Sequence, residues 1–401
     1  MDFSEFLKKV ENNEIGLVFQ MVVGRGGSLF MHSLLDSHPQ ILSYPGISNF
    51  YEDIWPAIEN DSSETKKLIS KILQHWIDLM LPYNIHHQLG EKKDETIKIN
   101  PSEIAQTTVG LLEGKTKTRK FVFLAMQFAI AKQLNTNLNE INVIYCQEHT
   151  MYPKKSNIEN IISDFKNSMF LTMIRDPRAN FIAIKNWDKK RFEFGVKTWE
   201  SQKYIQGAFA DLCIYWYVKL LVIANSFPNN FILIRLEDLQ QRQHELIDSL
   251  CKRINIKYLK SLEATTFQNK TWHGDSFSPQ KTGFRKPVSP KSWKVDLSFF
   301  KKLEIEFFLH QELHALKYPI LYYENYIYRF IAALLFPFFL IEDWKRIYER
   351  KYYAFMRQNK IGFFRAFGGS IKGYLIEKRK QLWFKFEANR KYPNVERIIF
   401  T

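Results

Sequence analysis

The most constraining feature of this sequence is a short apolar run followed at once by a glycine-rich turn. Residues 15–23 are almost unbroken in apolar character, which is typical of a strand buried on both faces of a parallel sheet. The turn comes next, and residues 29–35 then predict a helix, closed by Asp-Ser-His-Pro at 36–39. This order predicts a tight loop between a central strand and a helix, where glycines let the backbone turn sharply.

Further apolar runs alternate with helical patterns along the chain. Strands are expected at 141–145, 169–174 and 231–236, and helices at 156–165 and 212–224. Such alternation predicts βαβ units, and therefore an α/β fold with a P-loop-like, doubly wound parallel sheet flanked by helices.

The expected domain organisation follows the same pattern. An amphipathic helix at 65–81 predicts an insertion of about 50–135 between the first two core strands. The α/β domain is expected to span 1–320. Beyond it, residues 321–401 predict an appended helical, basic and aromatic C-terminal region.

The glycine loop, defined here as Gly24 to Ser28, has the composition of a phosphate-binding turn. Its N–H groups can point inward, and the following helix adds the positive end of its dipole. The ATP-binding pattern G-x-x-x-x-G-K-[ST] is absent, because no Gly-Lys pair stands in register. The loop is therefore a candidate phosphate site without the usual ATP-binding pattern, and a tight structural turn is the alternative.

The stretch from the glycine loop to Pro39 resembles the donor-binding loop of the sulfotransferase superfamily, including its bacterial and carbohydrate-type members. These enzymes use 3′-phosphoadenosine 5′-phosphosulfate (PAPS). The resemblance implies that Arg25 offsets charge on the leaving phosphate, that Ser28 binds the 5′-phosphate and that Phe30 stacks on adenine. The implied donor-binding residues of this segment are Gly24, Arg25, Gly26, Gly27, Ser28, Leu29 and Phe30. Gly26 and Leu29 stand where hydroxyl residues are usual.

A second segment, Arg175-Asp176-Pro177-Arg178 after an apolar strand, is similar to the family's 3′-phosphate motif. The resemblance implies that Arg175 holds that phosphate, a task suited to the planar guanidinium fork. The serine that usually follows is replaced by Ala183.

A third segment lies later in the chain. Thr265-Thr266-Phe267 is similar to the family's adenine-contacting stretch, which implies roles for Thr265 and Phe267. Arg285 and Lys286, followed by Trp293, are similar to the segment that closes over the 3′-phosphate. Pro287 replaces the usual glycine there, which removes a backbone donor.

Sulfonyl transfer needs a base that takes the proton of the acceptor hydroxyl. Glu148 and His149 leave a predicted strand at the carboxyl edge of the sheet, where ligands gather. By resemblance, His149 lies close to the catalytic histidine of small-molecule sulfotransferases, and Glu148 belongs to a Glu-Lys-Thr-Pro-like stretch. Glu52 is a third candidate, since some glycan-modifying members place a glutamate after the donor-loop helix.

Charge and composition bear on the partners. Residues 321–401 hold 16 Lys and Arg against 7 Asp and Glu, which favours anionic partners and predicts peripheral membrane contact as one reading. The longest apolar run, 330–341, is shorter than the roughly 20 residues of a spanning helix. The cysteines form no C-x-x-C pair, and the N-terminus has no signal peptide, so a cytoplasmic protein is expected.

Sequence reasoning leaves three functional classes open. The first is a PAPS-dependent sulfotransferase acting on a hydroxyl of a glycan, a glycolipid or a small alcohol. The second is a P-loop kinase or nucleoside triphosphatase, and the third is a catalytically inactive binding protein of the same fold. No motif for binding nucleic acid is found in the sequence.

Overall fold

The computed structural model describes residues 1–60, 64–80, 89–148, 154–193, 208–274, 282–283, 292–335 and 392–399. The chain divides into two units, each assembled from separated stretches of sequence. Unit 1 consists of 1–174, 227–288 and 398–401, and unit 2 consists of 175–226 and 289–397. The boundary expected between residues 320 and 321 stays a prediction.

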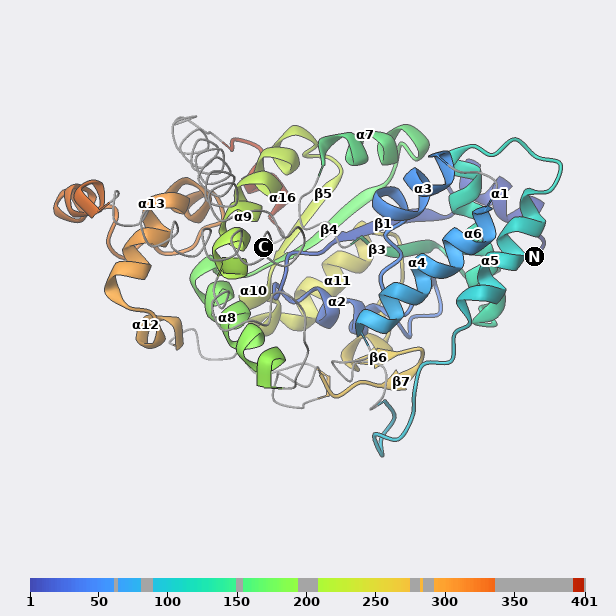
Figure 1. Cartoon of the computed structure of the whole chain (residues 1–401), viewed down its shortest axis with the longest axis horizontal. Helices are drawn as coiled ribbons and strands as arrows, with labels where there is room; N and C mark the ends of the chain where they lie inside the picture. The colour runs from blue at the N-terminus through green and yellow to red at the C-terminus, as the bar shows by residue number, and fades with distance from the viewer. Residues whose placement is uncertain are drawn as a thin grey trace, which may run out of the picture. The chain divides into compact units, whose positions relative to one another are not determined.

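Unit 1 is organised around a parallel sheet with the strand order β2-β3-β1-β4-β5 (Figure 1). Its strands are β1 (Gly16–Met21), β2 (Ile41–Ser43), β3 (Val143–Glu148), β4 (Met169–Ile174) and β5 (Phe231–Arg235). β1 is central and pairs with β3 on one side and β4 on the other. The predicted parallel α/β sheet is confirmed.

One face of the sheet packs against an aliphatic layer. The helices on this face are α2 (Ser28–Leu35), α10 (Leu236–Gln241) and α11 (Gln243–Arg253). Alternate strand residues such as Val18 and Ile232 join Leu34, Leu239 and Leu250 of these helices in a single buried cluster. This layer ties α2, and with it the glycine loop, to the sheet.

The opposite face carries an aromatic layer. Phe19 of β1 lies 6.1 Å from Phe170 of β4 and 5.7 Å from Phe123 of α6 (Arg119–Gln133), between ring centroids. Phe170 in turn stacks on Phe231 of β5 at 5.0 Å. Consecutive residues of a strand point to opposite faces of the sheet, so the central strands contribute side chains to both the aliphatic and the aromatic layer.

The helices between β2 and β3 cover this aromatic side. They are η1 (Phe50–Ile54), α3 (Trp55–Asn60), α4 (Thr65–Met80), α5 (Pro101–Leu112) and α6, and α4, α5 and α6 lie side by side (Figure 1). Asn100 starts α5 by accepting the N–H of Ser102 at 3.0 Å, with Pro101 in the first turn. The helix predicted at 65–81 is confirmed. It follows β2, a strand that the sequence analysis did not predict. A strand of three residues is too short to leave a detectable periodicity.

The remaining elements of unit 1 frame these layers. They are α1 (Phe3–Glu11), α7 (Lys155–Asp164), the short helix η5 (Lys260–Glu263) and the antiparallel pair β6 (Thr266–Phe267) and β7 (Lys270–Thr271). α1 packs on α6 through Phe3, whose ring lies 5.2 Å from that of Phe128.

Unit 2 is helical in its described part. Its helices are α8 (Pro177–Glu193), α9 (Ala208–Ser226), α12 (Ser292–Asp296), α13 (Phe299–Ala315) and residues 326–335, with α16 (Val395–Ile398) at its end. α9 packs against both α8 and α13. Helix is thus observed at 326–335 and 395–398 of the predicted C-terminal region, and residues 336–391 lie outside the described part.

Candidate active site

The glycine loop connects β1 to α2 in a conformation that few residues tolerate. Arg25 has φ of 59° and Gly27 has φ of 104°, both in the left-handed region that favours glycine. Between them, a Cβ on Gly26 would lie 2.7 Å from the carbonyl oxygen of Met173 and 3.0 Å from that of Val23. Glycine is required at position 26 because the loop backbone lies directly against the end of β4.

The loop leads into a helix start that presents backbone donors. The N–H of Gly26 closes the turn by donating to Val23 at 2.9 Å. α2 then begins at Ser28, and Gly27 at its N-cap makes no side-chain capping bond. The first-turn N–H groups of a helix have no partner within it, and they carry the positive end of its dipole. With Arg25 beside them, these groups can hold an anion.

Buried side-chain amides of the sheet hold the start of α2 in place. The side-chain amide of Gln20 in β1 donates to the carbonyl of Ser28 at 3.1 Å. The side chains of Gln147 and Tyr145 in β3 donate to the side-chain oxygen (Oε1) of Gln20 at 2.7 Å and 2.5 Å. Sequence reasoning missed this support, although a glutamine inside the apolar run 15–23 was the available signal: a buried polar group needs partners.

The other end of α2 is tied to the β6–β7 hairpin. The Asp36 carboxylate accepts the N–H of Asn269 at 3.0 Å and the hydroxyl of Thr266 at 3.1 Å. Burial raises the pKa of Asp36 in spite of these bonds. Phe267 stacks on His32 of α2 with 5.0 Å between ring centroids. α2 is therefore anchored at both ends.

The three residues predicted to contact adenine are buried. Phe30 belongs to the aliphatic cluster under α2, and Phe267 packs with Trp272 and the partly buried Leu29. The Thr265 hydroxyl donates to the Trp272 carbonyl at 2.7 Å. These contacts give the residues a packing role, and their contact with adenine stays a prediction.

Glu148 ends β3 directly opposite Met21 of β1. One carboxylate oxygen accepts the N–H of Phe50 at 3.0 Å and the hydroxyl of Ser48 at 3.3 Å. The other oxygen is buried and has no hydrogen-bond partner among the described residues. Burial raises the pKa of Glu148 to about 8, with the two hydrogen bonds opposing the shift. Glu148 is therefore largely protonated at neutral pH.

Glu52 lies on η1, the turn that starts with the Phe50 N–H bonded to Glu148. Its carboxylate forms an ion pair with Lys154 and accepts the side-chain amide of Asn157 at 2.5 Å. The same turn carries Tyr51, whose hydroxyl donates to Asp164 at 3.0 Å. The charge of Glu52 is thus already compensated within unit 1.

A small cavity opens between these groups. It is lined by Phe19, Met21, Tyr51, Glu148, Lys154, Asn157, Ile158, Ile161 and Phe170. The lining is mostly apolar, with Glu148, Lys154 and Asn157 as its polar groups. The structure therefore brings two of the predicted bases, Glu148 and Glu52, to the same part of unit 1.

The two arginines of the Arg-Asp-Pro-Arg motif differ in burial and in the partners of their guanidinium groups. Arg175, in unit 2, is half-buried, and its guanidinium forms no hydrogen bond or ion pair within the described part of the chain. Arg178 is fully buried and ion-paired with Asp176 at 2.8 Å and Glu306 at 2.7 Å. The first arginine is the one with a side chain to offer a ligand.

The remaining predicted site residues, His149, Arg285 and Lys286, lie outside the described residues. Among those that are described, no three His, Cys, Asp or Glu side chains are grouped to hold a metal ion. None of the described helices has the length and apolarity needed to cross a membrane.

The fold and loop define a class: parallel α/β proteins whose central strand leads through a glycine loop into a helix. Within that class, the family model described as "Sulfotransferase family" matches residues 18–260, a stretch that contains the glycine loop and β2 to β5. The chain belongs to the sulfotransferase family and is a transferase. Comparison with curated proteins gave no match.

Solved structures similar to this chain include three sulfotransferases. The sulfotransferase domain from the curacin biosynthetic pathway is 15% identical, with 80% of this chain and 97% of that one covered and a TM-score of 0.41. The domain from the Synechococcus PCC 7002 olefin synthase is 11% identical over 62% and 76%, with a TM-score of 0.37. Sulfotransferase STF1 from Mycobacterium tuberculosis H37Rv is 10% identical over 65% and 74%, with a TM-score of 0.34.

Proposed function

We propose that this sulfotransferase moves a sulfonate group from PAPS to a hydroxyl acceptor. The observation that carries the proposal is the glycine loop at the end of β1. Gly26 packed against Met173, together with Arg25 and Gly27 in left-handed conformations, turns the loop into the start of α2. This arrangement supplies backbone donors and a cation suited to a 5′-phosphosulfate.

The donor contacts divide by part of the nucleotide. The 5′-phosphosulfate would be held by Gly24, Arg25, Gly26, Gly27, Ser28 and Leu29. The 3′-phosphate would be held by Arg175, Arg285 and Lys286, and the adenine by Phe30, Thr265 and Phe267. Two separate basic grips for one nucleotide match PAPS better than ATP, and neither needs a metal.

The reaction is an in-line displacement. A base takes the proton of the acceptor hydroxyl, and the oxygen attacks the sulfur as the bond from sulfur to the bridging oxygen breaks. The electron pair of that bond leaves with 3′-phosphoadenosine 5′-phosphate. Arg25 and the loop amides stabilise the charge that builds on this leaving phosphate.

The base is proposed to lie at the carboxyl end of β3. Glu148 holds a proton at neutral pH, because burial raises its pKa to about 8, and its bonded oxygen supports the start of η1. Glu52 is compensated by Lys154. We therefore propose His149 as the base and Glu148 as the group that shapes its surroundings, with Glu148 itself as the alternative.

The acceptor is proposed to be a sugar hydroxyl of a glycan or glycolipid, in a cytoplasmic enzyme. The carbohydrate-type resemblance and the basic, aromatic composition of 321–401 support this choice. A small alcohol is the competing acceptor. Screening sugar and alcohol acceptors with labelled donor, and detecting the sulfated product, separates the two.

Contact with an anionic membrane is a second proposal, carried by an exposed stripe on the helix at 326–335. Tyr326, Ile327, Phe330 and Leu334 expose 84%, 66%, 65% and 59% of their surfaces, and the surrounding sequence is basic. Sedimentation with anionic and neutral vesicles tests it. Absence of binding to anionic vesicles at low salt would refute it.

Calorimetry with 3′-phosphoadenosine 5′-phosphate, with ADP as the nucleotide lacking the 3′-phosphate, tests the donor. We expect tighter binding of the 3′-phosphorylated nucleotide, and Arg175→Ala should remove about ten- to a hundredfold of that preference. Arg242→Ala, which alters an arginine on α11's N-terminal side paired with Glu245, is the control. Equal binding of both nucleotides by the native protein would overturn the proposal.

The alternatives predict different results in binding and turnover assays. A P-loop kinase or nucleoside triphosphatase would bind ATP with magnesium and turn it over. A catalytically inactive member would bind the 3′-phosphorylated nucleotide but transfer no sulfonate to any acceptor. The missing Gly-Lys pair in the glycine loop disfavours the first alternative.

A further inference from the structure

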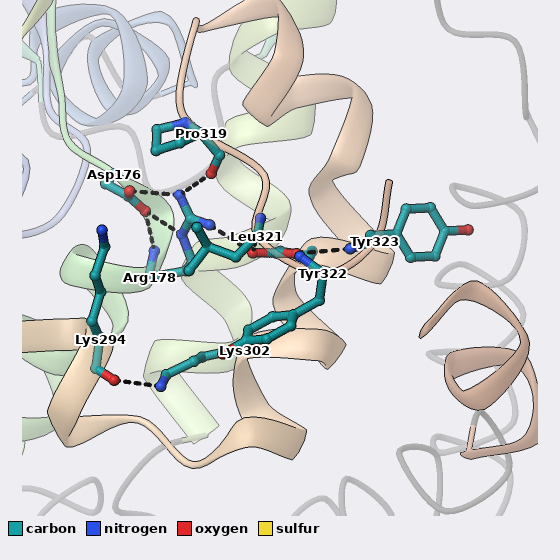
Figure 2. A network of polar contacts seen from close by, with 9 residues as sticks. Asp176, Arg178, Lys294, Lys302, Pro319, Leu321, Tyr322 and Tyr323 are labelled. Atoms are coloured by element: carbon teal, nitrogen blue, oxygen red, sulfur yellow. Dashed lines mark hydrogen bonds and ion pairs between the residues drawn. The ribbon is translucent and has the colours of Figure 1, made fainter. Parts of the chain in front are cut away.

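Arg178 lies at the centre of a buried polar network in unit 2. Its guanidinium donates to both oxygens of Asp176 at 2.9 and 2.8 Å, to Glu306 at 2.7 Å and to the carbonyl of Pro319 at 2.7 Å. The ring of Trp293 lies beneath it, 4.0 Å from the guanidinium carbon to the ring centroid. Figure 2 shows this guanidinium between Asp176 and Pro319.

Glu306 of α13 is the other half of the network. Besides Arg178, its carboxylate accepts the backbone N–H groups of Leu321, Tyr322 and Tyr323 at 3.0, 2.8 and 3.0 Å (Figure 2). The Glu306 side chain has no exposed surface. One carboxylate therefore fixes both the Arg178 side chain and the turn that follows the predicted catalytic domain.

The network acts on the backbone that carries Arg175. Asp176, bound to Arg178 through its side chain, also accepts the Arg178 N–H at 2.9 Å, so that residues 176–178 form one rigid turn. The Arg175 carbonyl accepts the hydroxyl of Tyr217 at 2.7 Å, and that hydroxyl accepts the amide of Asn180 at 3.0 Å. The Arg175 carbonyl and the backbone that follows it are thus held by hydrogen bonds, while the Arg175 guanidinium has no partner among the described residues.

We propose that Glu306 and Arg178 are positioning residues, which hold Arg175 for the 3′-phosphate of the donor. The inference rests on the proposed function. Glu306, Trp293 and the turn at 319–323 all lie outside residues 18–260 that match the family model. This chain therefore completes its second phosphate grip with a segment that the family match does not include.

Buried charge is the reason to assign positioning instead of packing alone. Taking charged groups out of water is costly, and well-packed apolar residues often stabilise a fold as well or better. A network of two carboxylates and one guanidinium instead fixes directions, because each hydrogen bond sets an angle as well as a distance. A phosphate-binding arginine needs a fixed direction.

The test compares binding of 3′-phosphoadenosine 5′-phosphate with binding of ADP by Glu306→Gln. We expect the affinity ratio of the two nucleotides to fall by at least about tenfold, while ADP binding changes little. Glu312→Gln is the matched control, because Glu312 is also buried on α13 and accepts the Tyr392 hydroxyl at 2.6 Å. It should leave the ratio unchanged.

Arg178→Lys is the second variant. It keeps the positive charge and much of the side-chain length but loses the planar guanidinium fork. It should lower the affinity ratio of the two nucleotides in the same way, and it replaces Glu306→Gln as the test if that variant does not fold. A native ratio in a folded Glu306→Gln or Arg178→Lys protein overturns the inference. Failure of the proposed function looks different, because the native protein itself would then bind both nucleotides equally.

Discussion

The glycine loop in unit 1 and the Arg-Asp-Pro-Arg turn in unit 2 are held by opposite means. The loop is held by shape: Gly26 leaves no room for a Cβ beside the Met173 carbonyl, and Gln20 supports the Ser28 carbonyl below it. The turn is held by charge, through Arg178 buried between Asp176 and Glu306.

The difference teaches which arginine of the Arg-Asp-Pro-Arg motif is available to a ligand. Arg25 and Arg175 each lie next to the feature that shapes their backbone, and each remains partly exposed. Arg178, two positions after the motif's aspartate, is buried and ion-paired with Asp176 and Glu306, so it cannot reach a ligand. Removing a shaping residue should disturb binding and stability together, whereas removing Arg175 should disturb binding alone.

The largest expected effect comes from Arg178→Met. The variant leaves Glu306 buried without its cation, which costs about 3–5 kcal/mol of unfolding free energy. Chemical denaturation followed by circular dichroism measures the loss. Arg175→Ala is the comparison and should change stability by less than about 0.5 kcal/mol. Equal losses in both variants would erase the distinction between the two arginines.

Gly26→Ala should have the next largest effect. Its Cβ would press on the Met173 carbonyl, so we expect a loss of about 1–3 kcal/mol and weaker binding of both nucleotides. Gly110→Ala is the control, because Gly110 lies in α5 with nothing within 4 Å of an added Cβ. That change should stabilise by about 0.5–1 kcal/mol. Unaltered nucleotide binding in Gly26→Ala would show that the loop is not the grip.

Glu148→Gln should have the smallest effect of the three near pH 5, and an effect that grows as the pH rises towards 8. With the pKa of Glu148 raised from 4.5 to about 8, the native state holds a proton that the unfolded state releases. Stability of the native protein therefore falls as pH rises from about 5 towards 8, on the order of a few kcal/mol in all. The glutamine variant, which cannot ionise, should lose that dependence.

Thermal melts of both proteins between pH 5 and pH 8 give the comparison, and identical pH profiles would contradict the raised pKa. Sulfonate transfer adds a second readout. Activity retained in Glu148→Gln but lost in His149→Gln supports His149 as the base, whereas the reverse assigns the proton transfer to Glu148.

Much of the fold was predictable because its strands are buried on both faces. Continuous apolar runs located β1, β3, β4 and β5 to within a few residues, whereas the three-residue β2 left no pattern. The position of the glycine loop was also predictable, because its glycines follow the apolar run of β1 directly and precede a helical pattern. Gln20 was visible as a polar residue in an apolar run, but its partner Gln147 was not.

The sequence by itself determined the class of sheet, the place of the glycine loop and the family, because these depend on local periodicity and on motifs with fixed spacing. Only the tertiary structure decided that Arg178 is buried against Glu306, 128 residues away, and that Glu148 is shielded from water beneath η1. Burial and pairing across such separations arise when distant segments share a core, and no local pattern encodes which buried charge will meet which partner.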